Sequence, residues 1–217
     1  FGSLGMTHFP SFVTCPVGHL LAFLGILTSN AQNSGDIELG IGLGVNLANV
    51  STIDGLSNTS FRTSFNAGVS GEYYFSDRWG VKAKLIYDNK GWSDGFIIDE
   101  NFNRATTDFK LNYITLPIMA NWHFSSNRNW YLNFGPYIGF LVNVEDSELG
   151  LDLKDEFKST DFGFAYGIGY KFKIDDNMKL YIEYDGQTGF IDIFEENSGN
   201  SVRNGRSSFN IGALFNL

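Results

Sequence analysis

The chain is short of cysteine and of positive charge. The first shortage excludes a disulfide within the chain, and the second argues against a nucleic-acid partner. Its single cysteine, Cys15, has no partner for a disulfide within the chain. It also precedes an apolar run, whereas a lipoprotein acylation site follows one. An exported fold without disulfides must rely on burial and hydrogen bonding, as a membrane β-barrel does. Lys and Arg number 15 against 24 Asp and Glu, and the net charge of −9 argues against a nucleic-acid partner.

The first 31 residues contain no Lys, Arg, Asp or Glu. They hold the apolar run HLLAFLGIL, which is too short to span a bilayer as a helix and is followed by TSNAQ. An apolar core ahead of a small residue such as Ala31 is typical of a secretory signal peptide. We therefore expect residues 1–31 to be a signal peptide and residues 32–217 to form the mature domain. The alternative is a buried N-terminal helix.

Glycine and aromatic residues are abundant, with 25 glycines and 16% Phe, Trp and Tyr. In DIELGIGLGVNL, Gly40, Gly42 and Gly44 recur at every second position, so the third glycine comes one position too early for a dinucleotide-binding G-x-G-x-x-G loop. Reading the stretch by twos places Ile, Leu and Val on one face and small or polar residues on the other. The pattern therefore predicts a β-strand.

The same alternation returns along the chain and predicts an all-β fold. The expected strands cover residues 36–50, 65–75, 79–90, 109–124, 130–144, 161–173, 180–187 and 208–217. The fourth segment is expected to direct its apolar residues outward at both ends, beginning with Phe109, Leu111 and Tyr113. This requires the phase to slip by one near Thr115 and Pro117, so we expect a β-bulge there.

Tight turns join the second strand to the third, the fourth to the fifth and the sixth to the seventh, whereas the other connections run to about 12 to 18 residues. Short turns at one end, long loops at the other and an even strand number predict an eight-stranded antiparallel up-and-down transmembrane β-barrel in an outer membrane. A soluble barrel would keep its apolar residues inside. We expect an aromatic girdle at the short-turn end, formed by Tyr73, Phe75, Trp79, Trp122, Trp130, Tyr170, Phe172 and Phe215, with Phe124 beside them.

The opposite face of the strands is small or polar, and it carries charges of both signs. Because charges away from water need partners, we expect these residues to pair across a lumen that eight strands leave nearly full. The predicted polar network consists of Glu38, Glu72, Lys82, Lys84, Asp88, Lys171, Glu183 and Asp185, and Lys90, Lys110 and Lys173 share its face. His123 is expected to point inward near the short turns, too isolated for a metal site. No cofactor is expected.

Two loops carry further signals. Residues 145–161 are rich in carboxylates but lack the spacing of a calcium loop, so we expect a solvated loop; the weaker alternative is divalent-cation bridging to lipopolysaccharide headgroups. Residues 89–108 include Trp92, Phe96 and Phe102. These residues indicate either a contact surface or a segment that caps the barrel mouth or prolongs the strands beyond the membrane.

At this point the sequence resembles the PorT-like outer-membrane β-barrel proteins of Gram-negative bacteria, which are relatives in shape of OmpA and OmpX. The resemblance rests on YITLPIMANWHF, YLNFGPYIGFLVN, DFGFAYGIGYKF and RNGRSSFNIGALFNL, and it covers residues 32–217. It implies an outer-membrane barrel and, for some members, an accessory role in protein secretion.

The hypothesis from sequence is a non-enzymatic outer-membrane protein with a structural or interaction role through its long extracellular loops. Its expected partners are outer-membrane lipid and lipopolysaccharide, the barrel-insertion machinery and a protein partner at the loops. One alternative is a small-molecule pore or carrier with an open lumen. Another is a membrane-embedded hydrolase, which would need His123 as its base.

Overall fold

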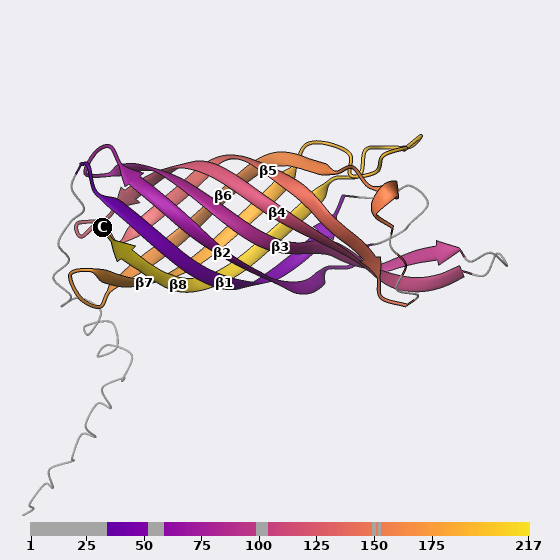
Figure 1. Ribbon diagram of the computed structural model, residues 1–217, viewed down its shortest axis with the longest axis horizontal. Coiled ribbons are helices and arrows are strands. Elements are labelled where there is room, and N and C mark those ends of the chain that lie inside the picture. The colour runs from indigo at the N-terminus through magenta and orange to yellow at the C-terminus, as the bar shows by residue number, and fades with distance from the viewer. Residues whose placement is uncertain (1–33, 52–58, 99–103, 149–150, 152) are drawn as a thin grey trace, which may run out of the picture.

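The computed structural model describes residues 34–51, 59–98, 104–148, 151 and 153–217, so the predicted signal peptide lies outside the described residues. The described chain forms a closed barrel in which each strand pairs antiparallel with the next, and β1 pairs with β8 (Figure 1). This confirms the predicted fold class. The strands are β1 (Ile37–Val50), β2 (Arg62–Tyr74), β3 (Trp79–Ile98), β4 (Arg104–Phe124), β5 (Trp130–Asp146), β6 (Thr160–Lys173), β7 (Met178–Gly189) and β8 (Asn204–Asn216).

The connections alternate in length. Residues 75–78, 125–129 and 174–177 form tight turns at the end of the barrel where the C-terminus lies (Figure 1). At the other end, residues 147–159 contain a short 3₁₀ helix, η1 (Lys154–Glu156), and residues 190–203 join β7 to β8. No helix within the described ranges is long and apolar enough to cross a membrane.

The connection between β3 and β4 differs from the expectation of a long loop. It is only residues 99–103, because both strands continue beyond the other strands as a projecting hairpin (Figure 1). The prediction that this segment prolongs the third and fourth strands is therefore correct. Trp92, at the base of the hairpin, turns inward and is 2% exposed, so the same segment also caps the barrel mouth.

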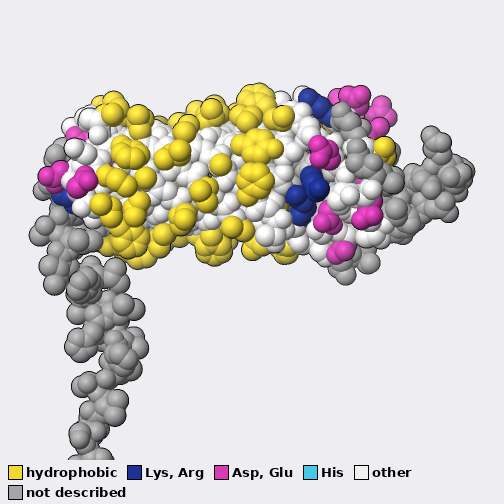
Figure 2. Space-filling model, turned by 60° about the horizontal axis from the view of Figure 1, so that its bottom comes forward, with side chains coloured by type: hydrophobic (Ala, Val, Ile, Leu, Met, Phe, Trp, Pro, Cys, Tyr) yellow, Lys and Arg dark blue, Asp and Glu magenta, His cyan; other side chains and the backbone are white. Residues whose placement is uncertain are grey.

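Side chains alternate between the two faces of the wall as the sequence pattern predicts. On β1 the outward residues include Ile41 and Leu43, exposed by 57% and 60%, whereas Glu38 and Asn46 are buried inside. In the face seen in Figure 2, hydrophobic side chains cover the middle of the barrel and charged ones gather towards its ends. The belt is apolar outside and the lumen is polar, which is the reverse of a soluble barrel.

The predicted phase slip in the fourth strand is wrong. Phe109, Leu111 and Tyr113 are buried inside the barrel, in the same phase as Thr115 and Pro117. The irregularity lies instead in β5, where the register against β4 shifts between the pairs Asn112–Asn143 and Tyr113–Leu141 and leaves Val142 as the extra residue. A bulge of this kind inserts one residue into one strand and reverses the phase beyond it.

Residues of the predicted girdle lie outward at the short-turn end. Their rings form a nearly continuous row across the strands from Trp79 on β3 to Phe172 on β6. Neighbouring ring centroids lie 6.2 Å apart for Trp79–Trp122, 5.2 Å for Trp122–Phe124, 6.2 Å for Phe124–Trp130, 5.0 Å for Trp130–Tyr170 and 4.7 Å for Tyr170–Phe172. Tyr73, Phe75 and Phe215 are also exposed at this end.

Candidate functional site

The lumen is occupied by ion pairs arranged in layers along the barrel axis. In the layer nearest the short turns, the Lys171 Nζ binds the carboxylates of Glu38 and Glu72. The Lys171 side chain is buried, with 2% of its surface exposed. The hydroxyl of Tyr74 lies 2.7 Å from the same Nζ. Lys179 approaches the other oxygen of Glu38 at 2.7 Å. Two carboxylates from neighbouring strands are therefore held together by one shared lysine, Lys171.

The middle layer is built on Glu183 of β7. Lys84 bridges Glu183 and Asp185, and Lys82 lies 3.5 Å from the second oxygen of Glu183. The Asn133 amide donates to that oxygen at 2.9 Å. These lysines come from β3, on the opposite side of the barrel from β7, so the pairs cross the lumen.

A third layer lies towards the long loops. The Arg206 guanidinium lies 3.1 Å from Asp88 and 2.6 Å from Asp185. Above it, Lys90 pairs with Asp161 at 3.0 Å, and the Tyr137 hydroxyl donates to the same carboxylate at 3.0 Å. Charge-assisted bonds of this kind give each buried charge the partner that burial demands.

The buried ion pairs join equal numbers of opposite charges, so the network balances itself. Among the described residues its carboxylates are Glu38, Glu72, Asp88, Asp161, Glu183 and Asp185, and its cations are Lys82, Lys84, Lys90, Lys171, Lys179 and Arg206. All eight residues predicted for the network lie inside the barrel. The charges of these ion pairs therefore cancel one another.

Sequence reasoning missed Asp161, Lys179 and Arg206. Each lies at or just before the first residue of an expected strand, and extending the alternation by one or two positions would have placed it inward. Two other residues do not belong to the network. Lys110 lies between the inward Phe109 and Leu111 and so faces outward, and Lys173 pairs with Asp176 near a short turn.

Tyrosine rings fill the spaces that glycines leave on neighbouring strands. Tyr131 lies directly opposite Gly169 in the ladder, and Tyr181 lies opposite Gly212. A Cβ built on Gly169 would lie 2.2 Å from the Tyr131 ring, and one on Gly42 would lie 2.0 Å from the Tyr181 hydroxyl. Covering a strand glycine with a cross-strand aromatic ring is a recognised way to stabilise it. The glycines at every second position therefore make room for inward rings.

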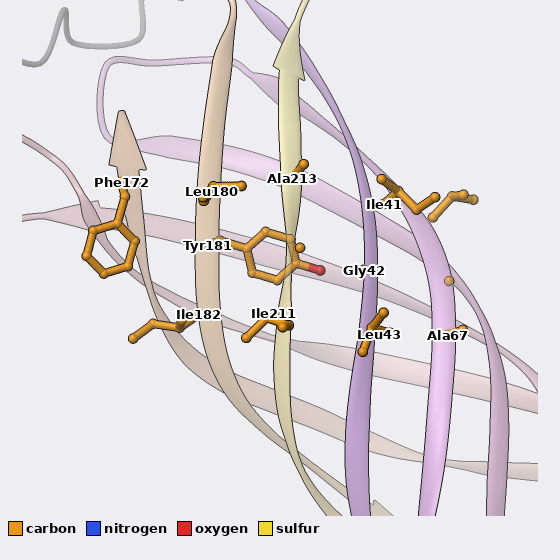
Figure 3. Close-up of a pocket in the computed structure, with 13 residues that line it drawn as sticks. Ile41, Gly42, Leu43, Ala67, Phe172, Leu180, Tyr181, Ile182, Ile211 and Ala213 are labelled. Carbon is orange, nitrogen blue, oxygen red and sulfur yellow. The ribbon is translucent and has the colours of Figure 1, made fainter. Parts of the chain in front are cut away.

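The wall is thin where these glycines meet. Gly42 pairs with Gly68 on one side and with Gly212 on the other, and an outward hollow of about 870 Å³ lies over them. Figure 3 shows Tyr181 extending across β8 with its hydroxyl towards Gly42. On the lumen side, the cavity beside Gly42 and Lys84 has a volume of only about 20 Å³, roughly enough for one water molecule.

An apolar cap closes the long-loop end of the lumen. Trp92 stacks on Phe109 with ring centroids 4.5 Å apart, and Phe157 from the β5–β6 loop contacts Phe194 from the β7–β8 loop at 4.9 Å. The two loops are also joined by backbone bonds from Lys158 N to the Ile193 carbonyl and from Glu195 N to the Glu156 carbonyl. The cap is formed by Val50, Trp92, Phe109, Leu111, Tyr113, Leu141, Val144, Phe157, Ile193 and Val202.

In the acidic segment 145–161, predicted to be a solvated loop, Asp146 and Asp161 are buried, whereas the other described carboxylates are exposed. Asp146 is buried and accepts hydrogen bonds from the backbone N–H groups of Glu148 and Leu151, whereas Asp161 belongs to the lumen network. Among the described residues, no group of three or more His, Cys, Asp or Glu side chains has a metal-binding arrangement.

His123 lies inside the barrel at the short-turn end. Its Nε2 lies 2.6 Å from Glu72, and its Nδ1 has no hydrogen-bond partner within the described chain. The ring is fully buried and packs 5.0 Å from Tyr74. No serine among the described residues hydrogen-bonds to the His123 ring.

The fold and its two faces define a class of protein. A closed eight-stranded barrel with an apolar belt, an aromatic girdle and a charge-balanced lumen is an outer-membrane β-barrel. The outer membrane protein beta-barrel domain family matches residues 30–195, and the chain belongs to this family. The protein is therefore located in the outer membrane. By the general rule for such barrels, we expect its short turns to face the periplasm and its long loops and cap to face the cell exterior.

Solved structures support the same fold. The outer membrane protein OprG from Pseudomonas aeruginosa is 13% identical, with a TM-score of 0.53 over 86% of this chain and 98% of that one. The N-terminal β-barrel domain of OprF from the same organism is 15% identical, with a TM-score of 0.50 over 86% of this chain and 100% of that one. No curated protein matches the chain.

Proposed function

We propose that this protein is a closed, non-enzymatic barrel whose functional surface is the capped extracellular end. The observation that carries the proposal is that side chains fill the lumen at two levels. Ion pairs cross it from β3 to β7, and the apolar cap seals its extracellular mouth. A barrel filled in this way serves as a membrane anchor for what it displays outside.

The displayed surface is formed by three elements. The β3–β4 hairpin projects from the rim, and the loops 147–159 and 190–203 fold over the mouth as one bonded unit. Because the two loops hydrogen-bond to each other, they present a preformed surface to a protein partner, which lowers the entropy lost on binding. The resemblance to PorT-like proteins supports an accessory role in protein secretion as the finer proposal. Outer-membrane lipid, lipopolysaccharide and the barrel-insertion machinery are the partners proposed for the membrane-embedded wall.

The pore hypothesis is tested by conductance. The purified full chain, reconstituted into a planar lipid bilayer beside a known porin as positive control, is expected to give no steady single-channel current. The reason is that the ion pairs of Lys82 and Lys84 with Glu183 cross the lumen. A reproducible, voltage-independent current from the folded protein would show that the lumen conducts and would favour the pore or carrier.

A further inference from the structure

The outward residues of β1, β7 and β8 change from apolar to polar near the extracellular end of these strands. Strand pairing sets the rows: Val45 lies beside Phe209, Leu47 beside Ser207 and Asn49 beside Gly205. Phe209 pairs in turn with Tyr184, whose hydroxyl lies 3.1 Å from the Ser207 hydroxyl. Moving outward along the axis, the rows therefore pass from apolar to polar within three steps. This is the boundary between the membrane core and the headgroups.

Arg203 stands at the outer edge of this boundary, and its neighbours fix its direction. Val202 is buried in the cap, and Asn204 is buried in the lumen, where it donates to Asp161 at 3.1 Å. Between two inward side chains, Arg203 faces outward and is exposed. Reciprocal bonds of 2.9 Å between Arg203 and Ser51 tie its backbone to the end of β1. Among the described residues, no carboxylate lies within ion-pair distance of the Arg203 guanidinium.

A hollow of about 540 Å³ lies directly below Arg203. Gly205 contributes no side chain between Asn49 and Thr188, and the hollow is walled by exposed aromatic rings. These rings are Phe61, Tyr166 and Phe190. The hollow therefore has apolar walls, hydrogen-bonding groups at mid-height and one cation at its rim.

We propose that this hollow binds a phosphorylated glycolipid of the outer leaflet, the lipid A portion of lipopolysaccharide. A phosphate would lie against the Arg203 guanidinium, where the geometry of a planar fork of N–H donors suits it. Asn49 and Thr188 would meet the sugar, and an acyl chain would follow Leu47 and the rings towards the membrane core. The inference depends on the outer-membrane location and is independent of any partner at the cap.

The test measures lipid retention by native mass spectrometry. The full chain is released from detergent micelles containing either bis-phosphorylated lipid A or its dephosphorylated form. Two variants separate the parts of the site. Arg203→Gln removes the charge and keeps the hollow, whereas Gly205→Leu fills the hollow and keeps the charge. A Cβ on Gly205 meets only the Asn49 carbonyl oxygen, at 3.6 Å, so a side chain can start there without moving the backbone.

Each variant has a matched control on another part of the barrel. Arg128→Gln removes a half-buried arginine from a short turn, where it pairs with Asp77. Gly71→Leu fills an outward glycine of β2, at which a Cβ would meet only the Leu39 side chain, at 3.7 Å. Faster migration of unboiled than of boiled protein on a gel checks that all four variants are folded.

The wild type is expected to retain one bis-phosphorylated lipid A and to lose it when the phosphates are removed. Arg203→Gln and Gly205→Leu should each weaken retention by about tenfold. The first variant loses one charge-assisted contact, and the second loses the hollow. The controls should retain lipid A as the wild type does. Equal retention of the dephosphorylated lipid, or an equal loss in a control and its matched variant, would overturn the proposal. So would undiminished retention by folded Arg203→Gln.

Discussion

Replacing Lys171 with methionine is expected to lower the free energy of unfolding by about 3–5 kcal/mol, the usual cost of removing one member of a buried ion pair. Lys171 is the lysine that bonds Glu38 and Glu72 together, and its Nζ also lies 5.3 Å above the Tyr131 ring. Without it, two carboxylates would face each other in a lumen from which water is excluded. The measurement is urea unfolding of the protein in lipid vesicles, followed by tryptophan fluorescence.

Two further variants distinguish the charge from the packing. Lys173→Met removes a lysine two residues along the same strand, whose partner Asp176 is exposed, and should cost at most about 1 kcal/mol. Adding Glu72→Gln to Lys171→Met removes one of the stranded charges and should recover part of the loss. If Lys171→Met is no more damaging than Lys173→Met, the lumen is wetter than the ion-pair network implies.

Gly169→Ala is expected to destabilise the barrel by about 1–3 kcal/mol, an overpacking cost produced by a single methyl group. The added Cβ would lie 2.2 Å from the Tyr131 ring, which is fully buried. Tyr131 has no room to move, because Lys82 lies 4.7 Å above its ring and His123 packs 5.9 Å away. Unfolding in urea measures the effect, and the double variant with Tyr131→Leu should relieve it.

The matched substitution is Gly71→Ala on β2. There the new methyl group meets only the Leu39 side chain, at 3.7 Å, which is ordinary van der Waals contact. The change should be neutral or slightly stabilising, since glycine weakens a strand interior. Equal losses at Gly169 and Gly71 would mean that backbone freedom, and not the space for a tyrosine, explains the glycines of this chain.

The alternation of the sequence was sufficient to predict the eight strands because the membrane imposes one rule along the whole belt. Outward residues such as Ile41 and Phe164 meet lipid, and inward ones such as Glu38 and Lys171 meet each other. The same rule located the aromatic girdle, since Trp and Tyr rings favour the headgroup level. The alternation is clearest where a strand faces lipid on one side and the polar lumen on the other along its whole length.

The rule fails at the long-loop end, where the predicted phase of the fourth strand is wrong. Phe109, Leu111 and Tyr113 were expected outside because they are apolar, yet they pack into the cap. Above the bilayer, water surrounds the barrel, so apolar side chains gain free energy by turning inward as they do in a soluble protein. The cap also needs Phe157 and Ile193 from two loops distant in sequence, and no local pattern joins them.

Pairing across the lumen was the other limit. Alternation predicts that Lys84 and Glu183 point inward, but it does not say that β3 lies opposite β7 at the same height. That depends on the tilt and stagger of the strands, which closure of the barrel fixes. The hollow below Arg203 has the same origin, because Phe61, Gly205 and Phe190 come from three separate segments.

The central claim is that the lumen is closed while the cap faces outward, and single cysteines test it most directly. In a Cys15→Ser background, a membrane-impermeant thiol reagent is applied to intact cells carrying Ser198→Cys, Ser126→Cys or Thr115→Cys. Ser198 lies in the β7–β8 loop, Ser126 in a short turn and Thr115 fully buried in the lumen wall. We expect Ser198→Cys to react at once, Ser126→Cys only after the outer membrane is permeabilised, and Thr115→Cys only after unfolding. Rapid reaction of folded Thr115→Cys from outside would contradict a closed lumen.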